Sequence, residues 1–175
     1  MFSNPNKNIA QFRLMHGMNV ADIGAGSGAY SILAGAIVGD GTVFAIDIQK
    51  EMLSRLDSEV ENLNINNIKT IWGDVEQDGG TKLADSVVDA CILSNILFQI
   101  EDKDSCLKEV KRILKPGGKI LLVDWSDSWN GMGPHKDMVH TESQAYALFE
   151  KHKLKPVEEI SAGEHHYGII FTYES

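Results

Sequence analysis

The sequence is poor in cysteine and has no long apolar run. Two of its 175 residues are cysteines, Cys91 and Cys106, and their spacing matches neither a disulfide framework nor a metal-ligand pattern. We expect both to be buried thiols in a reducing compartment. Every apolar run is far shorter than the roughly 18 residues of a membrane span, and the polar start SNPNKN lacks the apolar core of a signal peptide. The sequence therefore predicts a cytoplasmic protein without membrane contact.

Positive charge is also scarce. The chain has 16 lysines and arginines against 25 aspartates and glutamates, which gives a formal net charge of -9. Such a surface does not attract nucleic-acid phosphates over long distances, so nucleic acid is disfavoured as a partner. Basic residues gather between 103 and 119, but acidic residues interleave with them and indicate a solvated helix face.

The residues that are present alternate as in an α/β fold. A chain of 175 residues that is 43% hydrophobic fits one domain, residues 1–175, with a core of its own. The apolar pattern predicts strands in the first half of 20–32 and at 42–46, 68–72 and 87–94. Helices are predicted within the lead-in segment 1–17 and at 29–38, 51–62, 102–114 and 141–152. Two further strands are predicted at 156–161 and 167–172.

The stretch Val20 to Ile32, VADIGAGSGAYSI, is the centre of this pattern. A buried strand is followed by three glycines, Gly24, Gly26 and Gly28, and then by an apolar helix. Glycine lets a ligand approach the backbone, and the N–H groups at the helix start point toward it. The stretch also satisfies the looser G-x-G-x-x-A pattern of dinucleotide-binding folds, so a nicotinamide or flavin enzyme stays open at this point.

The motif D-I-G-A-G-S-G, with Asp22 two residues before the first glycine, resembles the first motif of the class I S-adenosyl-L-methionine-dependent methyltransferases. Within that family the chain resembles small, type 11-like members. In that family the turn passes under the methionine part of the cofactor. The resemblance implies that Asp22 helps to hold the ammonium group, and that the turn contributes Gly24, Ala25, Gly26 and Gly28.

Later motifs extend the cofactor site. Asp47 lies 23 residues after Gly24, where nucleoside-binding α/β folds place a carboxylate against both ribose hydroxyls, and Ile48 would offer an apolar edge to adenine. The resemblance implies that Asp74 binds the adenine amino group and that the Val75 backbone meets the ring.

Two more motifs complete the resemblance. Ser94 and Asn95 correspond to the family's fourth motif, whose backbone faces the methyl group and the methionine ammonium. LKPGGKILLVDW is similar to its turn and fifth strand. Five motifs in order over residues 18–125 then imply a Rossmann-like, seven-stranded sheet, mostly parallel with an antiparallel C-terminal strand, and helices on both faces.

The acceptor side is less defined. Residues 126–140 break the alternation and hold Trp129 and His135, so we expect a substrate loop there. The candidate catalytic residues are His135 and Asn95, with His16 or His166 if the fold brings them over the cleft. The adjacent histidines 165 and 166 point to opposite sides of an extended chain, and no metal site is expected.

These expectations combine into one function. The chain is expected to transfer a methyl group from S-adenosyl-L-methionine to a small molecule by in-line displacement, which leaves S-adenosyl-L-homocysteine. Because the sulfonium is already electrophilic, alignment and exclusion of water are the main requirements. A nucleoside-binding regulatory module without turnover and an NAD-dependent oxidoreductase remain as alternatives. The acceptor atom, the need for a general base and the oligomeric state stay open.

Overall fold

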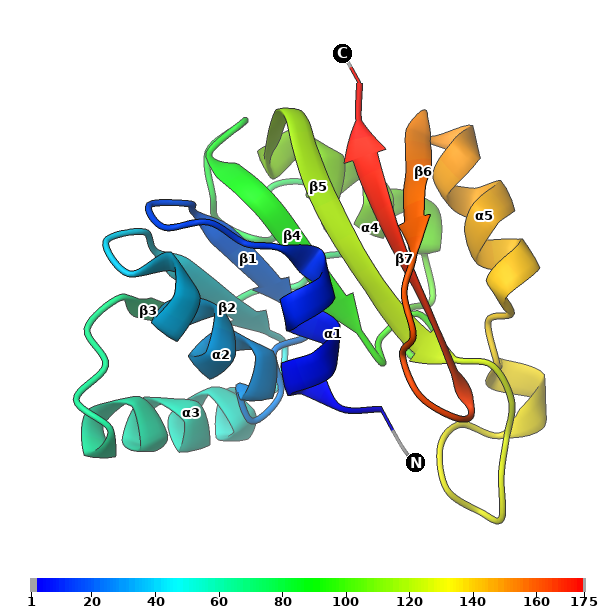
Figure 1. Ribbon diagram of the computed structural model, residues 1–175, viewed down its shortest axis with the longest axis horizontal. Coiled ribbons are helices and arrows are strands. Elements are labelled where there is room, and N and C mark those ends of the chain that lie inside the picture. The colour runs from blue at the N-terminus through cyan, green and yellow to red at the C-terminus, as the bar shows by residue number, and fades with distance from the viewer. Residues whose placement is uncertain (1–2, 175) are drawn as a thin grey trace.

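The computed structural model describes residues 3–174 and contains one seven-stranded sheet with helices on both faces (Figure 1). The expectations for residues 1, 2 and 175 lie outside the described residues. The elements, in chain order, are α1 Pro5–Phe12, β1 Val20–Ile23, α2 Ala29–Val38, β2 Val43–Asp47, α3 Lys50–Asn62, β3 Ile68–Trp72, β4 Val88–Ser94, α4 Lys103–Ile113, β5 Leu114–Trp125, a short 3-10 helix Lys136–Met138, α5 Glu142–Lys151, β6 Leu154–Glu159 and β7 His166–Tyr173.

The strand order β3-β2-β1-β4-β5-β7-β6 creates a topological switch point between β1 and β4. β1 pairs in parallel with both neighbours, so Asp22 lies between Ala45 of β2 and Ile92 of β4. The carboxyl ends of these strands therefore meet at one edge of the sheet. In α/β folds of this kind ligands bind at that edge, beside the switch point.

The last strand runs against the others. β7 is antiparallel to β5, with Trp125 opposite His166, and β6 is antiparallel to β7. β7 therefore begins at the carboxyl edge, whereas the parallel strands end there. The predicted fold class, including the antiparallel C-terminal strand, is confirmed.

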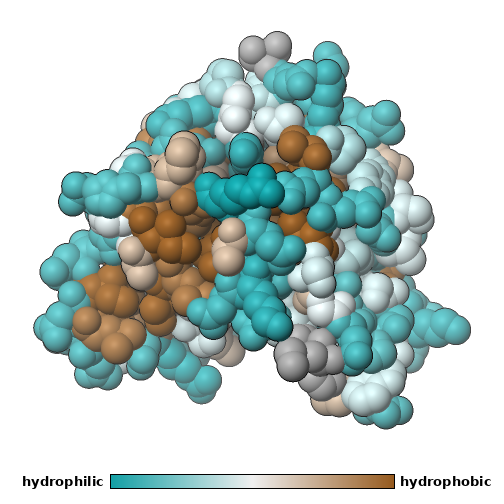
Figure 2. Space-filling model, in the orientation of Figure 1, coloured by the Kyte–Doolittle hydropathy of each residue, from teal (hydrophilic) through white to brown (hydrophobic). Residues whose placement is uncertain are grey.

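Two hydrophobic clusters hold the layers together. One joins the sheet to α1 and α2 through residues such as Phe12 and Val38, and the other joins it to α4 and α5 through residues such as Leu107 and Phe149. The face of Figure 1 carries α1 and α2, and the space-filling view shows an apolar surface over α2 (Figure 2). α2 is apolar nearly all round, and Ile37 remains 36% exposed.

Several local predictions are confirmed and two differ. Asn4 caps α1, Thr141 and Gln144 form the expected capping box of α5, and both cysteines are fully buried. The segment 115–118 was expected to be a turn, but it belongs to β5, whose ladder with β4 shifts register there. β6 begins at Leu154 instead of residue 156, because Leu154 already pairs with Tyr173.

Candidate cofactor and acceptor site

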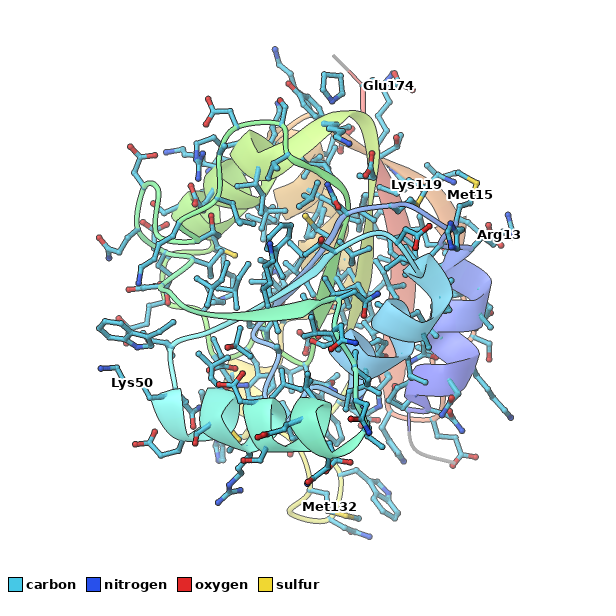
Figure 3. All side chains as sticks on the ribbon, turned by 90° about the vertical axis from the view of Figure 1, so that its left-hand side faces the viewer. Arg13, Met15, Lys50, Lys119, Met132 and Glu174 are labelled. Carbon is cyan, nitrogen blue, oxygen red and sulfur yellow. The ribbon has the colours of Figure 1, made fainter. Side chains whose placement is uncertain are left out.

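A cavity of about 330 Å³ opens at the carboxyl edge of β1, β2 and β3. Figure 3 shows Lys50, at the start of α3, and Met132, on the loop after β5, toward this end of the molecule, with Lys119 and Glu174 toward the other. Ligand cavities commonly have this size, with apolar walls and a few polar groups. The lining residues come from four strand ends: Ile23, Gly24, Gly26, Ile46, Asp47, Ile48, Gln49, Met52, Gly73, Asp74, Val75, Glu76, Ile96, Gln99, Ile100 and Glu101.

Asp47 ties the glycine turn to the end of β2. Its Oδ2 accepts a hydrogen bond of 2.8 Å from the Gly26 N–H, and its Oδ1 accepts one of 2.8 Å from the Gln49 N–H. The side chain is only 8% exposed, yet it lines the cavity. Each carboxylate oxygen has a second lone pair, so Asp47 can still accept two hydrogen bonds from a ligand. The sequence pattern predicted a ligand contact at Asp47 but not its hydrogen bonds with the Gly26 and Gln49 N–H groups.

The three glycines of the turn have different surroundings. A Cβ on Gly24 would lie 2.5 Å from Ile96 Cδ1, and one on Gly28 would lie 2.2 Å from Leu56 Cδ1. A Cβ on Gly26 would meet no atom within 4 Å, although Gly26 lines the cavity. All three glycines have a positive φ, and Gly24 and Gly28 also leave room for the Ile96 and Leu56 side chains. Gly26 instead leaves free the space over which a ligand would lie.

Asp22 is separated from the lining of the cavity. It is 2% exposed, and its Oδ2 accepts a hydrogen bond of 2.6 Å from Ser31 Oγ in the first turn of α2. Burial raises the pKa of Asp22 to about 6, and the charge of Asp47 adds to the effect. The expected contact of Asp22 with an ammonium group stays a prediction.

The charge of the cavity is one-sided. Its lining includes four carboxylates, Asp47, Asp74, Glu76 and Glu101, and no lysine or arginine. Asp74 is held by its own turn, where its Oδ1 accepts from the Glu76 N–H at 2.9 Å. Since like charges in a cleft focus a field of one sign, this cavity favours a cation and opposes a pyrophosphate. Apolar side chains such as Ile48 and Val75 can cover a flat ring.

The end of β4 offers two further polar groups. Ser94 Oγ is buried and has no hydrogen-bond partner among the described residues. A buried polar group without a partner costs about 1–3 kcal/mol. Asn95 follows in a left-handed conformation with a φ of 54°, and its N–H donates to the Val123 carbonyl at 2.8 Å. Both predicted residues therefore lie at the switch-point edge.

His166 is the candidate histidine that the fold brings against Asn95. Its Nε2 lies 3.1 Å from Asn95 Oδ1, and its ring lies 4.2 Å from that of Trp125. By contrast, His135 has a 75% exposed side chain beside Asp137. His16 lies beside Asp40, which follows α2 at the opposite edge of the sheet.

Asp124 is a residue that the sequence analysis missed. Its Oδ2 accepts from the N–H groups of Ile96 at 3.1 Å and Leu97 at 2.8 Å, and its Oδ1 accepts from the Trp125 N–H at 2.8 Å. Burial raises its pKa to about 6, against the effect of these bonds. Asp124 thus fixes the turn that carries Asn95 and Ile96. A carboxylate that ends an apolar strand, as Asp47 does, was the available signal.

The expected substrate loop, residues 126–140, packs against the same edge. The Trp129 ring stacks on His165 at 4.8 Å, and a Cβ on Gly133 would lie 2.6 Å from the Trp125 ring. Trp129 is still 38% exposed. The described residues contain no group of three or more histidines, cysteines and carboxylates arranged to hold a metal ion. Nor do they form a helix long and apolar enough to cross a membrane.

The chain is similar to curated methyltransferases over part of its length. It is 33% identical over 116 residues to an arsenite methyltransferase of Aquipseudomonas alcaligenes, a match that covers 63% of this chain and 34% of that protein. It is 34% identical over 112 residues to a ubiquinone/menaquinone biosynthesis C-methyltransferase of Haemophilus ducreyi, covering 63% of this chain and 42% of that protein. The chain thus spans less than half the length of these two relatives.

Solved structures and a family model cover nearly the whole chain. The structure of a SAM-dependent methyltransferase from Aquifex aeolicus superimposes with a TM-score of 0.89 at 26% identity, over 98% of this chain and 90% of that one. The family model described as a methyltransferase domain matches residues 14–171. The resemblance seen in the glycine turn and the later motifs is therefore confirmed. This chain belongs to the methyltransferase domain family, whose enzymes use S-adenosylmethionine as the cofactor.

Proposed function

We propose that this chain, as a single catalytic domain, transfers the methyl group of S-adenosylmethionine to a small-molecule acceptor by in-line displacement. The observation that carries the proposal is the cavity beside the glycine turn, which is lined by four carboxylates and no cationic side chain. A sulfonium nucleoside with an ammonium group suits that field. The matching family model gives independent support.

Each part of the cofactor has residues suited to hold it. Asp47 would accept from the ribose hydroxyls with the lone pairs left by Gly26 and Gln49. Asp74 and the Val75 N–H would bind the adenine edge, with Ile48 against the ring. The methionine end would lie on the turn from Gly24 to Gly28, between Asp22 and the end of β4.

Binding of this cofactor supplies an electrophilic methyl group, so the protein's task is to align and to exclude water. The rigid turns set by Asp47 and Asp124 fix the two sides of the edge. Ser94 and Asn95, at the end of β4, would face the methyl group. The loop 126–140 would close over the acceptor through Trp129. No covalent intermediate on the protein is needed for this reaction.

The names of two relatives suggest different acceptors, arsenite and a carbon atom in ubiquinone/menaquinone biosynthesis. Arsenic(III) is a soft centre that favours thiolates, as soft metals do. Cys91 and Cys106 are both fully buried, and burial raises the pKa of Cys106 to about 12 and also raises that of Cys91. Neither offers a thiolate at the acceptor edge. We therefore favour an organic acceptor, in a cytoplasmic setting, and the net charge of -9 speaks against nucleic acid.

Calorimetry and a turnover assay test the proposal. Titration with S-adenosylmethionine, S-adenosylhomocysteine and NAD should give binding of the first two and none of the third. Release of S-adenosylhomocysteine over a panel of organic acceptors should then identify turnover. Binding of NAD in preference would favour the oxidoreductase alternative, and tight binding of the nucleosides with no turnover on any acceptor would favour the regulatory module.

A further inference from the structure

His166 is held at the acceptor edge by partners on both sides of its ring. Nδ1 lies 3.2 Å from the carbonyl oxygen of Glu164, and Nε2 lies 3.1 Å from Oδ1 of Asn95. The Trp125 ring lies against it, with the ring centroids 4.2 Å apart. Asn95 and His166 are 71 residues apart in the chain and meet because β7 starts where β4 ends.

The two contacts determine which nitrogen of the His166 ring carries a proton. A backbone carbonyl can only accept, so Nδ1 must carry a proton to bond Glu164. In a neutral ring Nε2 then has a lone pair, and it pairs with Asn95 only if the amide turns its NH₂ group toward the ring. When Nε2 gains a proton, Oδ1 of Asn95 becomes its acceptor. The Asn95 amide can therefore match both states of the ring by a half-turn.

We propose that His166 is the general base of the reaction, with Asn95 as its positioning residue, and that the acceptor is a hydroxyl on an unsaturated carbon, a phenol or an enol. This inference rests on the methyl transfer proposed above. It adds the class of acceptor and the destination of its proton. Trp125 and the exposed Trp129 provide the flat apolar surfaces that an aromatic acceptor needs.

The proton and the electrons balance in one step. The acceptor hydroxyl takes the place of the Asn95 amide at Nε2 and gives its proton to that nitrogen. The oxygen lone pair forms the new bond to the methyl carbon, while the electron pair of the sulfur–carbon bond stays on sulfur. The imidazolium donates to Oδ1 of Asn95 and then releases its proton to water.

The surroundings of His166 set its working range. Burial is the main cause that lowers the pKa of His166. The hydrogen bond with the Glu164 carbonyl and the charge of Asp127 act against this, while the charge of His165 lowers the pKa further. The neutral base is thus present at neutral pH, and activity should rise with pH through the pKa of His166 and then level off. Asp22 and Asp124 each have a pKa of about 6 and titrate in the same window, so variants must identify the group.

The test compares His166→Asn with His16→Asn, an exposed histidine at the opposite edge. The probes are phenol, para-chlorophenol and para-nitrophenol, assayed between about pH 5 and pH 9. His166→Asn should lower kcat for phenol by about a hundredfold or more. The loss of kcat should be much smaller for para-nitrophenol, because this more acidic phenol ionises without a general base. The acid limb of the pH profile should disappear in this variant. Asn95→Asp should move that limb to higher pH, because a carboxylate raises the pKa of a neighbouring histidine.

Affinity for S-adenosylhomocysteine separates the failure of this inference from failure of the proposed function. It should stay within about twofold of wild type in His166→Asn. An unchanged acid limb would assign the limb to Asp22 or Asp124 and overturn the role of His166. Equal loss of kcat for all three phenols would make His166 merely structural. Turnover on amines or thiols but on no phenol would overturn the acceptor class, and loss of nucleoside binding in the wild-type protein would overturn the proposed function itself.

Discussion

The two halves of the carboxyl edge are built in opposite ways. On the cofactor half, backbone turns and carboxylates are tied together over short distances in the chain, as in the bond from Gly26 to Asp47, 21 residues apart. On the acceptor half, an imidazole, an amide and two indoles meet from distant segments, with Asn95 and His166 separated by 71 residues. The first half thus suits one fixed cationic ligand, whereas the second depends on contacts between segments that are distant in the chain.

The largest expected effect tests the cofactor half. Asp47→Ala removes the acceptor of two backbone N–H groups and of both expected ribose bonds. Hydrogen bonds to a charged group contribute about 1.5–3 kcal/mol each, so affinity for S-adenosylhomocysteine should fall at least tenfold, to about a hundredfold. Calorimetry measures this, with Asp40→Ala at the opposite edge as the control. Unchanged affinity would contradict the ribose contact.

Asp22→Asn separates stability from binding. Burial raises the folded-state pKa of Asp22 to about 6 from 3.8. An acid whose pKa is raised by folding contributes its full stability when the pH is below its pKa in the unfolded protein. That contribution is lost as the pH rises through its pKa in the folded protein. Asparagine does not titrate and still accepts from Ser31, so the variant should exceed wild type above about pH 6 by as much as about 3 kcal/mol. Urea unfolding at about pH 4 and pH 8 checks this.

The same variant tests the ammonium contact. If the Asp22 carboxylate holds the ammonium group, Asp22→Asn should weaken binding of S-adenosylhomocysteine by about tenfold while the protein gains stability. Equal affinity in the two proteins would remove Asp22 from the site and leave it as a packing residue under α2.

Two glycine substitutions sharpen the comparison inside the turn. Gly28→Ala places a Cβ 2.2 Å from Leu56 Cδ1, whereas Gly26→Ala meets no protein atom within 4 Å. Both positions have a positive φ, which costs alanine about 1–2 kcal/mol. Gly28→Ala should therefore lower the thermal midpoint of unfolding more than Gly26→Ala does. Gly26→Ala should lower the affinity for the nucleoside more than Gly28→Ala does. If Gly26→Ala instead loses more stability than Gly28→Ala and keeps its affinity for the nucleoside, the space beside Gly26 does not hold the ligand.

The smallest effect is expected on the exposed loop. His135 was a candidate base on sequence grounds, but its side chain is 75% exposed beside Asp137. His135→Ala should change kcat for the preferred acceptor by less than about threefold, since a positioned base contributes at least about a hundredfold. A loss as large as that of His166→Asn would move the chemistry to the loop 126–140.

Much of the fold followed from local patterns. The alternation of apolar runs with capped helices placed each strand to within a few residues, and the resemblance through five motifs implied the fold class and the family, both of which are confirmed. Local patterns succeeded because strands, turns and caps depend on residues close in sequence. The segment 115–118 was expected to be a turn, but the structure includes it in β5 as an unpaired bulge, because the ladder with β4 passes from Leu114 directly to Lys119.

The sequence by itself determined the glycine turn, the carboxylate at the end of β2 and the scarcity of cysteine. Only the tertiary structure decided that Asp22 faces Ser31, that Asp124 fixes the turn after β4 and that His166 meets Asn95. The physical reason is that β4 runs parallel to β5 and β7 runs antiparallel to it. The end of β4 and the start of β7 therefore lie at the same edge of the sheet. No spacing within the chain encodes that meeting.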